Sequence, residues 1–388
     1  MIKMLTAHTR KADDIRAAVA EIREQIDLQK QCLKNAVGIL SFHPDFLASG
    51  AVKAVCDALP FDAIGGTTAA EAVSGKDDDR MLALSVLTSD DIVFRSGVSR
   101  AIEGDAAGPV RELYSRVAPP EMGNPSLLFV IGPVIENAGG DEIVAEIDAA
   151  SGGIPLFGAL AFTPLLDLSG IETCANGRRY PDAITLIAFF GEVNPRFYVT
   201  SIPDERGIHE KAVITQAEKN RIQRINGFVP VDYLEKIGLA EKGRVTYEII
   251  TYPFVLTLKD GSQVVRTAYK VADDGSILSY GSVPRGARVC FSEIDADFVV
   301  QSSGKIVAQA LSDTADVNPR SALIVSCMSR RWVLGERADL EMKEIGKSLD
   351  SSLPYQFAYS GGEICPVRNR EGQWVNRFHN FSMIVCVL

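Results

Sequence analysis

The stretch VGILSFHPDFLASGAVKAVCDALPFDAIGGTT, residues 37–68, contains one complete unit of the predicted fold. It opens with the apolar run Val37–Phe42, turns at His43-Pro44-Asp45, and continues as a helical stretch to Leu59. A second strand then leads into Ile64-Gly65-Gly66-Thr67-Thr68. A strand–helix–strand unit of this length implies two parallel strands joined by a right-handed crossover.

The same order of elements recurs twice further along the chain. The second copy runs from Leu127–Ile131, through a helix near 140–150, to Leu156-Phe157-Gly158. The third runs from Ala322–Ser326, through a helix near 336–349, to Gln356–Ser360. Each copy ends with a third strand, namely Leu82–Leu87, Ala183–Phe190 and Ser382–Leu388. Residue identity between the copies is low, and any α/β protein contains such units.

Antiparallel hairpins are expected between the copies. Short turns at Ser89-Asp90, Asp260-Gly261 and Asp273-Asp274-Gly275-Ser276 each separate two strand-like segments. The sequence therefore predicts an α/β fold of two domains with mixed sheets, repeated strand–helix–strand units and added hairpins.

The chain start and the domain division can also be predicted. Residues 11–29 carry apolar side chains at helical spacing, with Thr9 as a plausible N-cap. We expect residues 1–30 to form a helix that packs on a first domain, 31–205. A polar stretch from Asp204 to about Lys211 separates it from a second domain, 206–388.

Composition excludes several classes of protein. The chain has 388 residues, 40 Lys plus Arg against 50 Asp plus Glu, and a net charge of −10. An acidic chain without a dense basic run is a poor binder of nucleic acid or of an anionic membrane. No apolar run approaches the roughly 18 to 20 residues that span a bilayer, and no secretory segment opens the chain.

Cysteine and histidine spacing argues against metal sites and disulfide frameworks. The seven cysteines are scattered without a CxxC pair, and the four histidines show no HExxH pattern. The chain also lacks GxGxxG, GxxxxGK[ST] and GxSxG motifs. We expect a protein of the reducing cytoplasm, without a cofactor or metal.

Glycine turns after the second strands are the first candidate sites. Gly65, Gly66, Thr67, Thr68 and Glu71 follow one strand. The corresponding place in the last copy holds Tyr359, Ser360, Gly361, Gly362 and Glu363. Ligands of α/β sheets lie beyond the carboxyl ends of strands, where hydroxyls and a carboxylate suit a small polar ligand. The same glycines could also serve only as turns.

Three further residues could take part in chemistry. Cys327 could be a nucleophile or a redox-sensitive thiol, although such residues are more often small buried hydrophobes. Arg330 could bind a carboxylate with two hydrogen bonds, or lie on the surface. His379 could bind a ligand, or be a hydrogen-bonded structural histidine.

Six motifs, in order from about residue 35 to the C-terminus, resemble the FIST sensory family. Ile64–Glu71 resembles its GCTTAGE turn, with Gly66 in place of the cysteine, and Pro155–Ala161, which contains Gly158, resembles its PVFGGLA stretch. The other four are similar to the family's INGxPA, SCxGR, YTYGEI and FHNQT segments: Arg224–Gly227, Ser326–Arg330, Tyr359–Ile364 and Arg377–Ser382.

This resemblance implies a small-ligand sensor with an N-terminal and a C-terminal FIST domain. Amino acids are the family's proposed ligands, and its partners include histidine kinases, cyclic-dinucleotide enzymes and chemoreceptors. We expect the signal to leave through such a partner in trans. Arg330 would pair with a ligand carboxylate, Glu71 or Glu363 with an amine, and His379 would orient one of them.

Two alternatives stay open. One branch of the family consists of haem-dependent nitric-oxide sensors that carry a histidine in an FHDG segment. This chain has Cys174-Ala175-Asn176-Gly177 at the corresponding place, and its closing motif also departs from that of the branch. If haem binds, His379 or Cys174 would be the axial ligand by residue type. The other alternative is an enzyme that depends on Cys327.

Overall fold

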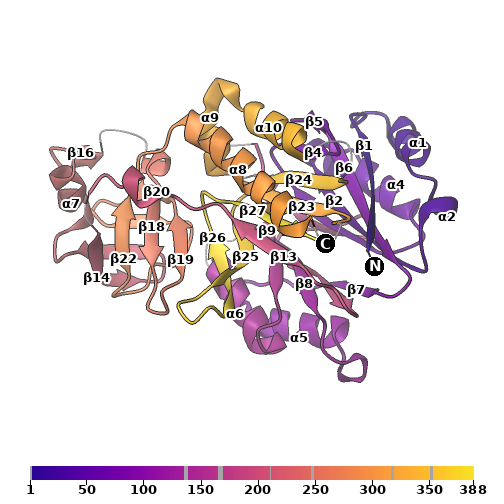
Figure 1. Cartoon of the computed structure of the whole chain (residues 1–388), viewed down its shortest axis with the longest axis horizontal. Coiled ribbons are helices and arrows are strands. Elements are labelled where there is room, and N and C mark those ends of the chain that lie inside the picture. Colours follow the sequence, from indigo (N-terminus) through magenta and orange to yellow (C-terminus); the bar gives the residue numbers. More distant parts are fainter. Residues whose placement is uncertain are drawn as a thin grey trace.

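The computed structural model describes residues 2–134, 139–164, 169–209, 211–245, 249–315, 319–349 and 353–388. Three strand–helix–strand units occupy the expected positions, and in each of them the two strands pair in parallel (Figure 1). The first unit is β2 (Asn35–Phe42), α3 (Pro44–Ala48), α4 (Ala51–Asp57) and β3 (Ala63–Thr67). The second unit is β8 (Leu127–Gly132), α6 (Gly140–Ser151) and β9 (Leu156–Leu160). The third unit is β23 (Ala322–Cys327), α9 (Met328–Leu334), α10 (Leu340–Leu349) and β24 (Tyr355–Ser360).

A third strand forms in each unit, as the apolar runs predicted, and it pairs antiparallel with the first strand. These are β6 (Leu82–Ser89), β12 (Thr185–Phe190) and β27 (Met383–Val387). All eight residues of β6 are buried, although three of them are Ser or Thr, because both faces of this strand are covered. Each third strand also pairs with an edge strand, namely β1 (Lys3–Thr9), β7 (Val93–Val98) or β13 (Arg196–Val199).

The units exchange hairpins in a cycle. Each unit contains a hairpin between its second and third strands: β4–β5 (Glu71–Val73, Lys76–Asp78), β10–β11 (Thr173–Ala175, Arg178–Tyr180) and β25–β26 (Glu363–Arg368, Trp374–His379). The hairpin of the first unit pairs with β24 of the third, that of the third with β9 of the second, and that of the second with β3 of the first. No unit can therefore complete its sheet alone.

The result is three six-stranded sheets of one topology. Their strand orders are β1-β6-β2-β3-β10-β11, β7-β12-β8-β9-β25-β26 and β13-β27-β23-β24-β4-β5. Strand register makes individual residues equivalent. Gly66, Ala159 and Ala358 correspond, since each pairs with the first residue of the hairpin that it receives. The fold thus has a threefold pseudo-symmetry that the sequence shows only as a repeated order of elements.

Helices cover the outer faces of the sheets. In each unit, a helix that precedes the first strand packs against the helix that joins the first and second strands. α1 packs on α4, α5 on α6 and α8 on α10. The remaining helices and single turns are α1 (Ile15–Gln25), α2 (Leu28–Gln31), α5 (Ala107–Val117), α7 (Pro230–Lys236), α8 (Ala296–Thr314), and the 3₁₀ turns 120–122, 204–206, 249–251 and 335–337.

A separate antiparallel sheet is inserted between β13 and α8 and forms one end of the molecule, at the left in Figure 1. Its strands are β14 (Ala212–Glu218), β15 (Arg221–Ile225), β18 (Phe254–Thr257), β19 (Gln263–Arg266), β20 (Ala268–Val271), β21 (Ile277–Ser279) and β22 (Arg288–Phe291). Short strands β16 (Ala240–Glu241) and β17 (Arg244–Val245) pair beside α7. An ion pair of 2.7 Å between the buried Arg266 and the half-buried Asp141 joins this inserted sheet to α6.

Two of the three predicted hairpins form, and one does not. β18 pairs with β19 across Asp260-Gly261, and β20 pairs with β21 across 273–276. The prediction of a hairpin at Ser89-Asp90 was wrong, because β6 pairs with β1 and β2 whereas β7 pairs with β12. A short polar turn there carries the chain from one sheet to the next.

The chain start also differs from the expectation. Residues 3–9 form a strand, so Thr9 ends β1 and does not cap a helix. α1 begins at Ile15 after Asp14, whose carboxylate accepts a hydrogen bond of 3.0 Å from the amide of Ala17. Within the described ranges, no helix combines the length and the apolar character needed to cross a membrane. The domain boundary near residue 206 stays a prediction.

Candidate functional site

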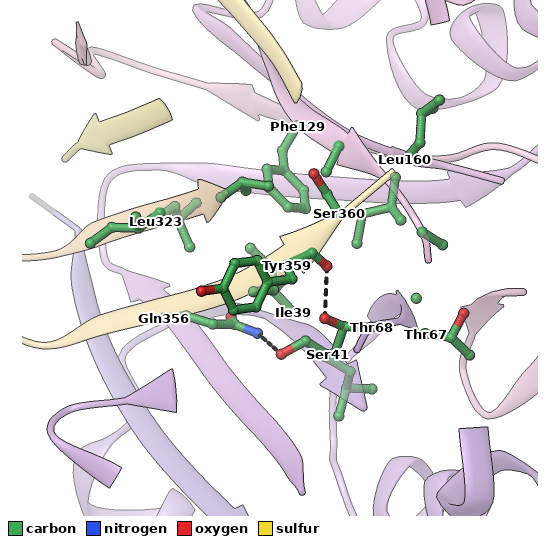
Figure 2. A pocket seen from close by; sticks show the side chains of 18 residues that line it. Ile39, Ser41, Thr67, Thr68, Phe129, Leu160, Leu323, Gln356, Tyr359 and Ser360 are labelled. Atoms are coloured by element: carbon green, nitrogen blue, oxygen red, sulfur yellow. Dashed lines mark hydrogen bonds between the residues drawn. The ribbon is translucent and has the colours of Figure 1, made fainter. Parts of the chain in front are cut away.

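A cavity of about 60 Å³ lies where the second strands of all three units end (Figure 2). Its walls come from the first and second strands of every unit: Ile39, Leu40, Ser41, Gly66, Thr67, Thr68, Phe129, Ile131, Ala159, Leu160, Ala161, Leu323, Ile324, Val325, Gln356, Ala358, Tyr359 and Ser360. We call it the central cavity. The carboxyl ends of parallel strands are the common ligand position of α/β sheets.

Register places this cavity on the axis of pseudo-symmetry. Its walls consist largely of equivalent triplets, which are Ile39/Phe129/Leu323, Ser41/Ile131/Val325, Gly66/Ala159/Ala358, Thr67/Leu160/Tyr359 and Thr68/Ala161/Ser360. Most of these residues alternate along their strands, so one face of each strand points at the axis. Three copies of one surface therefore enclose the central cavity.

Hydrogen bonds between units hold the strand ends around the axis. The amide of Phe162 donates to the carbonyl of Thr67 at 2.8 Å, and the amide of Gly361 donates to that of Leu160 at 3.0 Å. The hydroxyl of Thr68 closes the ring by donating to the carbonyl of Tyr359 at 2.7 Å (Figure 2). A displacement of one strand end would therefore strain the hydrogen bonds that hold the other two.

The glycines of the predicted turns allow close approach of the strands. A Cβ on Gly66 would lie 2.9 Å from Ile131 and 3.0 Å from Ala161 across the cavity. On Gly65 it would meet the carbonyl oxygen of Leu40 at 2.5 Å, and on Gly158 it would collide with the carbonyl of Val130. Gly65 and Gly158 therefore serve strand packing, whereas Gly66 forms part of the wall.

Gln356 is the most polar residue of the wall. Its Nε2 donates to the hydroxyl of Ser41 at 2.9 Å, which joins the third unit to the first (Figure 2). Its Oε1 is buried and has no hydrogen-bond partner among the described residues. A buried acceptor without a donor is costly, at about 1–3 kcal/mol, so this atom marks a place where a ligand or water would be held.

Glu71 and Glu363 occupy equivalent positions at the starts of β4 and β25, behind the cavity wall. Glu363 accepts hydrogen bonds from the hydroxyls of Ser360 and Ser382, at 2.8 and 2.7 Å. Burial still raises the pKa of Glu363 to about 8. For Glu71, burial and the nearby Asp78 and Asp79 raise the pKa well above its usual value. Glu363 is therefore mainly protonated at neutral pH, and the pKa of Glu71 is shifted in the same direction.

Arg330 lies in a closed polar cluster. Its guanidinium donates to Glu341 at 2.8 Å and to Ser303 at 2.7 Å, and the side chains of Arg330 and Glu341 are 1% and 0% exposed. Glu341 also accepts from Ser326 and from the hydroxyl of Tyr359, at 3.0 and 2.8 Å. A ligand carboxylate could reach Arg330 only by displacing Glu341.

Cys327 lies beside a second, smaller cavity of about 10 Å³. Gly361 and Asn380 also line this cavity, together with Tyr280 from the inserted sheet. Burial raises the pKa of the Cys327 thiol, so it is protonated and a poor nucleophile.

His379 and Cys174 are each buried by protein contacts. A ring nitrogen of His379 lies 3.2 Å from the carbonyl oxygen of Cys365, and burial lowers the pKa of the ring to about 3. Cys174 lies on β10, fully buried beside Cys56. Neither side chain lines the central cavity, and these surroundings do not fit a haem.

The predicted residues thus fall into three groups. Gly66, Thr67, Thr68 and Tyr359 line the central cavity. Cys327 and Gly361 line the smaller cavity. The third group packs behind these walls: Gly65, Glu71, Gly158, Arg330, Gly362, Glu363 and His379.

Sequence reasoning missed the wall residues that lie before the glycine turns. Gln356, Ser41 and Ala358 were counted only as parts of strands, and Ala159 only as part of a family motif, although all four line the cavity. The signal that could have found them is the alternation of side chains along each strand, traced back from the turn by two and four positions.

Comparison with protein families gives two matches that lie one after the other along the chain. Residues 36–227 match the FIST N domain, and residues 231–366 match the FIST C domain. No curated protein is similar enough to the chain to count as a relative. The two matches are in tandem and together cover most of the three units and the inserted sheet. On these grounds, the chain belongs to the FIST family.

Proposed function

We propose that this protein is a sensor that binds a small molecule in the central cavity and passes the signal to another protein. FIST domains are associated with sensory signal transduction and with small-ligand binding. The observation that carries the choice of site is the position of the cavity, on the axis where all three units meet.

Tyr359 offers a route by which occupancy could reach the surface. This residue lines the cavity, and its hydroxyl donates to Glu341, the partner of Arg330 on α9. Arg330 also binds Ser303 on α8. A ligand that moves Tyr359 would therefore act on the packing of α8, α9 and α10, which lie together on one side of the molecule (Figure 1).

The ligand class implied by the family resemblance is an amino acid. An amino acid needs partners for an ammonium group and for a carboxylate. The expected partners lie behind the wall: Arg330 is engaged by Glu341, and burial raises the pKa of both Glu71 and Glu363, which disfavours the charged carboxylates that an ammonium group needs. This class thus requires the cluster around Arg330 to open, which makes it the more demanding form of the proposal.

The two alternatives find less support. Haem would need the buried His379 or Cys174 to leave its present contacts. An enzyme that depends on Cys327 would need a thiolate, whereas burial keeps that thiol protonated.

The compartment and the partner belong to the same proposal. All seven cysteines are free thiols, which suits the reducing cytoplasm. The recipient of the signal would be a histidine kinase, a cyclic-dinucleotide enzyme or a chemoreceptor. Co-purification with such a partner, compared with and without ligand, tests this part.

A thermal-shift screen tests the site. The compounds are the amino acids, small carboxylates, small neutral amides and alcohols, nucleotides and haemin, each applied to the wild type, to Ala358→Val in the cavity wall and to Ala149→Val on the exposed face of α6. A ligand at 100 times its Kd adds about 2.7 kcal/mol of stability. We expect one compound to shift the wild type and Ala149→Val, and to shift Ala358→Val much less. Equal shifts in all three proteins, or no shift with any compound, would contradict the proposal.

A further inference from the structure

The three equivalent walls of the central cavity differ in polarity. The second unit contributes only apolar side chains, among them Phe129, Ile131 and Ala161. The first and third units contribute the hydroxyls and the amide. Two triplets show the difference directly: Ser41 corresponds to Ile131, and both Thr68 and Ser360 correspond to Ala161. The cavity therefore has one apolar side and one polar side.

Most of the polar side is already committed to hydrogen bonds within the protein. Thr68 donates to the carbonyl of Tyr359 at 2.7 Å, and Ser360 donates to Glu363 at 2.8 Å. Both hydroxyls thus hold the strand ends together.

Two groups on the polar side can each still make a hydrogen bond to a ligand. In the part of the chain that the structure describes, Oε1 of Gln356 accepts no hydrogen bond. The Ser41 hydroxyl accepts from Gln356, and no described residue accepts its proton. One acceptor and one donor thus lie side by side, and a single ligand group that both donates and accepts would satisfy them.

Charge and size narrow the ligand further. No charged side chain is among the described residues that line the cavity, and an ionised group buried without a partner is strongly disfavoured. A volume of about 60 Å³ holds only a few water-sized groups. These limits exclude a zwitterion and a large planar ligand from the cavity in this form.

We propose that the central cavity takes a small neutral molecule with an apolar end and a single hydroxyl or amide group. The apolar end faces Phe129 and Ile131 of the second unit, and the hydroxyl or amide bonds Gln356 and Ser41. This inference rests on the proposed function, since it names the ligand class of the same site.

Saturation-transfer NMR with two probes of similar size tests this class. Propionamide is neutral and amphipathic, whereas alanine carries both charges. We expect propionamide to bind the wild type at least tenfold more tightly than alanine. Gln356→Met should weaken propionamide binding about tenfold, and Ser41→Ala should weaken it in the same direction. Gln301→Met, on the exposed face of α8, is the matched control and should bind as the wild type does.

The outcomes separate the two proposals. If alanine binds as tightly as propionamide and Ala358→Val abolishes both, the neutral class is wrong while the cavity remains a ligand site. If Gln356→Met and Ser41→Ala fold and bind propionamide as the wild type does, the assigned polar contact is wrong. If neither probe binds the wild type, the neutral class is wrong, and the proposed function is then decided by the thermal-shift screen.

Discussion

Glu71 and Glu363 hold the same position in the first and third units, yet their surroundings differ. Glu363 accepts hydrogen bonds from Ser360 and Ser382. Neither oxygen of Glu71 makes a hydrogen bond of normal geometry with a described residue, although the amides of His43 and Met81 lie near enough to lower its pKa slightly. The repeat thus preserves backbone register, while each unit has its own polar contacts.

The third unit also differs from the other two in its polar side chains as a whole. It contains the saturated cluster around Arg330 and Glu341, the Glu363 contacts and Gln356 in the cavity wall. The polar groups that the first unit contributes to the wall are all hydroxyls, and the second unit contributes apolar groups alone. Pseudo-symmetry therefore builds the cavity, and departures from it give the cavity its chemistry.

Breaking the saturated cluster should have the largest effect. Arg330→Met leaves Glu341 buried without its ion-pair partner, which costs about 3–5 kcal/mol of the free energy of unfolding. The double variant Arg330→Met, Glu341→Leu should recover part of this loss, because no charge then remains unpaired while the hydroxyls of Ser326 and Tyr359 lose their acceptor. Chemical denaturation measures both. A loss below about 1 kcal/mol in the single variant would show that the cluster contributes little.

Removing the two equivalent carboxyls should give effects of opposite sign. Glu71→Met deletes a buried acid that has no hydrogen bond of normal geometry, so we expect a gain of about 1–2 kcal/mol in stability. Glu363→Met leaves two serine hydroxyls without their acceptor and should cost about 1–3 kcal/mol. Changes of the same sign at both positions would mean that the difference in hydrogen bonding has no energetic consequence.

The dependence of the unfolding free energy on pH should show the smallest change per unit measured, and it tests the surroundings of Glu363 directly. The pKa of Glu363 is raised from 4.5 to about 8, so the folded state binds the proton more tightly. The contribution of Glu363 to stability should therefore fall as pH rises between these values, by at most about 1.4 kcal/mol per pH unit. Glu363→Gln should flatten this slope in urea titrations run at several pH values, and an unchanged slope would assign it to other groups.

The titration of His379 should change stability with pH in the opposite direction, which provides an internal check. Burial lowers its pKa from 6.5 to about 3, so its contribution to stability is present above pH 6.5 and is lost as pH falls toward 3. The two titrations therefore act in different directions where their ranges overlap. Measuring Glu363→Gln against the wild type isolates the glutamate.

Local patterns in the sequence account for the units but not for their association. Apolar runs and glycine turns predicted the first, second and third strand of each unit, since these signals are local. The strands of the three hairpins and the edge strands β1 and β13 were not predicted. The exchange of hairpins could not be predicted, because Glu71 pairs with Ala358 and Thr173 pairs with Gly66 across the chain. The false hairpin at Ser89-Asp90 has the same origin, since a turn signal does not specify which sheet continues.

The candidate site was predictable in place and less so in chemistry. The turns at Gly66–Thr68 and Tyr359 do line the cavity. Charged residues near the turns suggested a charged ligand, yet the fold pairs or buries them. Arg330 meets Glu341 from α10 in a cluster to which α8 contributes Ser303, and nothing in the sequence marks that meeting. The polar contact of Gln356 with Ser41 joins residues from distant units.

A crystal structure of the protein with propionamide tests the central claim most directly. The account predicts electron density for the amide in the central cavity, with its polar end at Gln356 and Ser41 and its ethyl group against Phe129. Crystals of Ala358→Val under the same conditions should lack this density. An empty central cavity in the wild type, or propionamide bound only elsewhere, would contradict the claim that this axis is the ligand site.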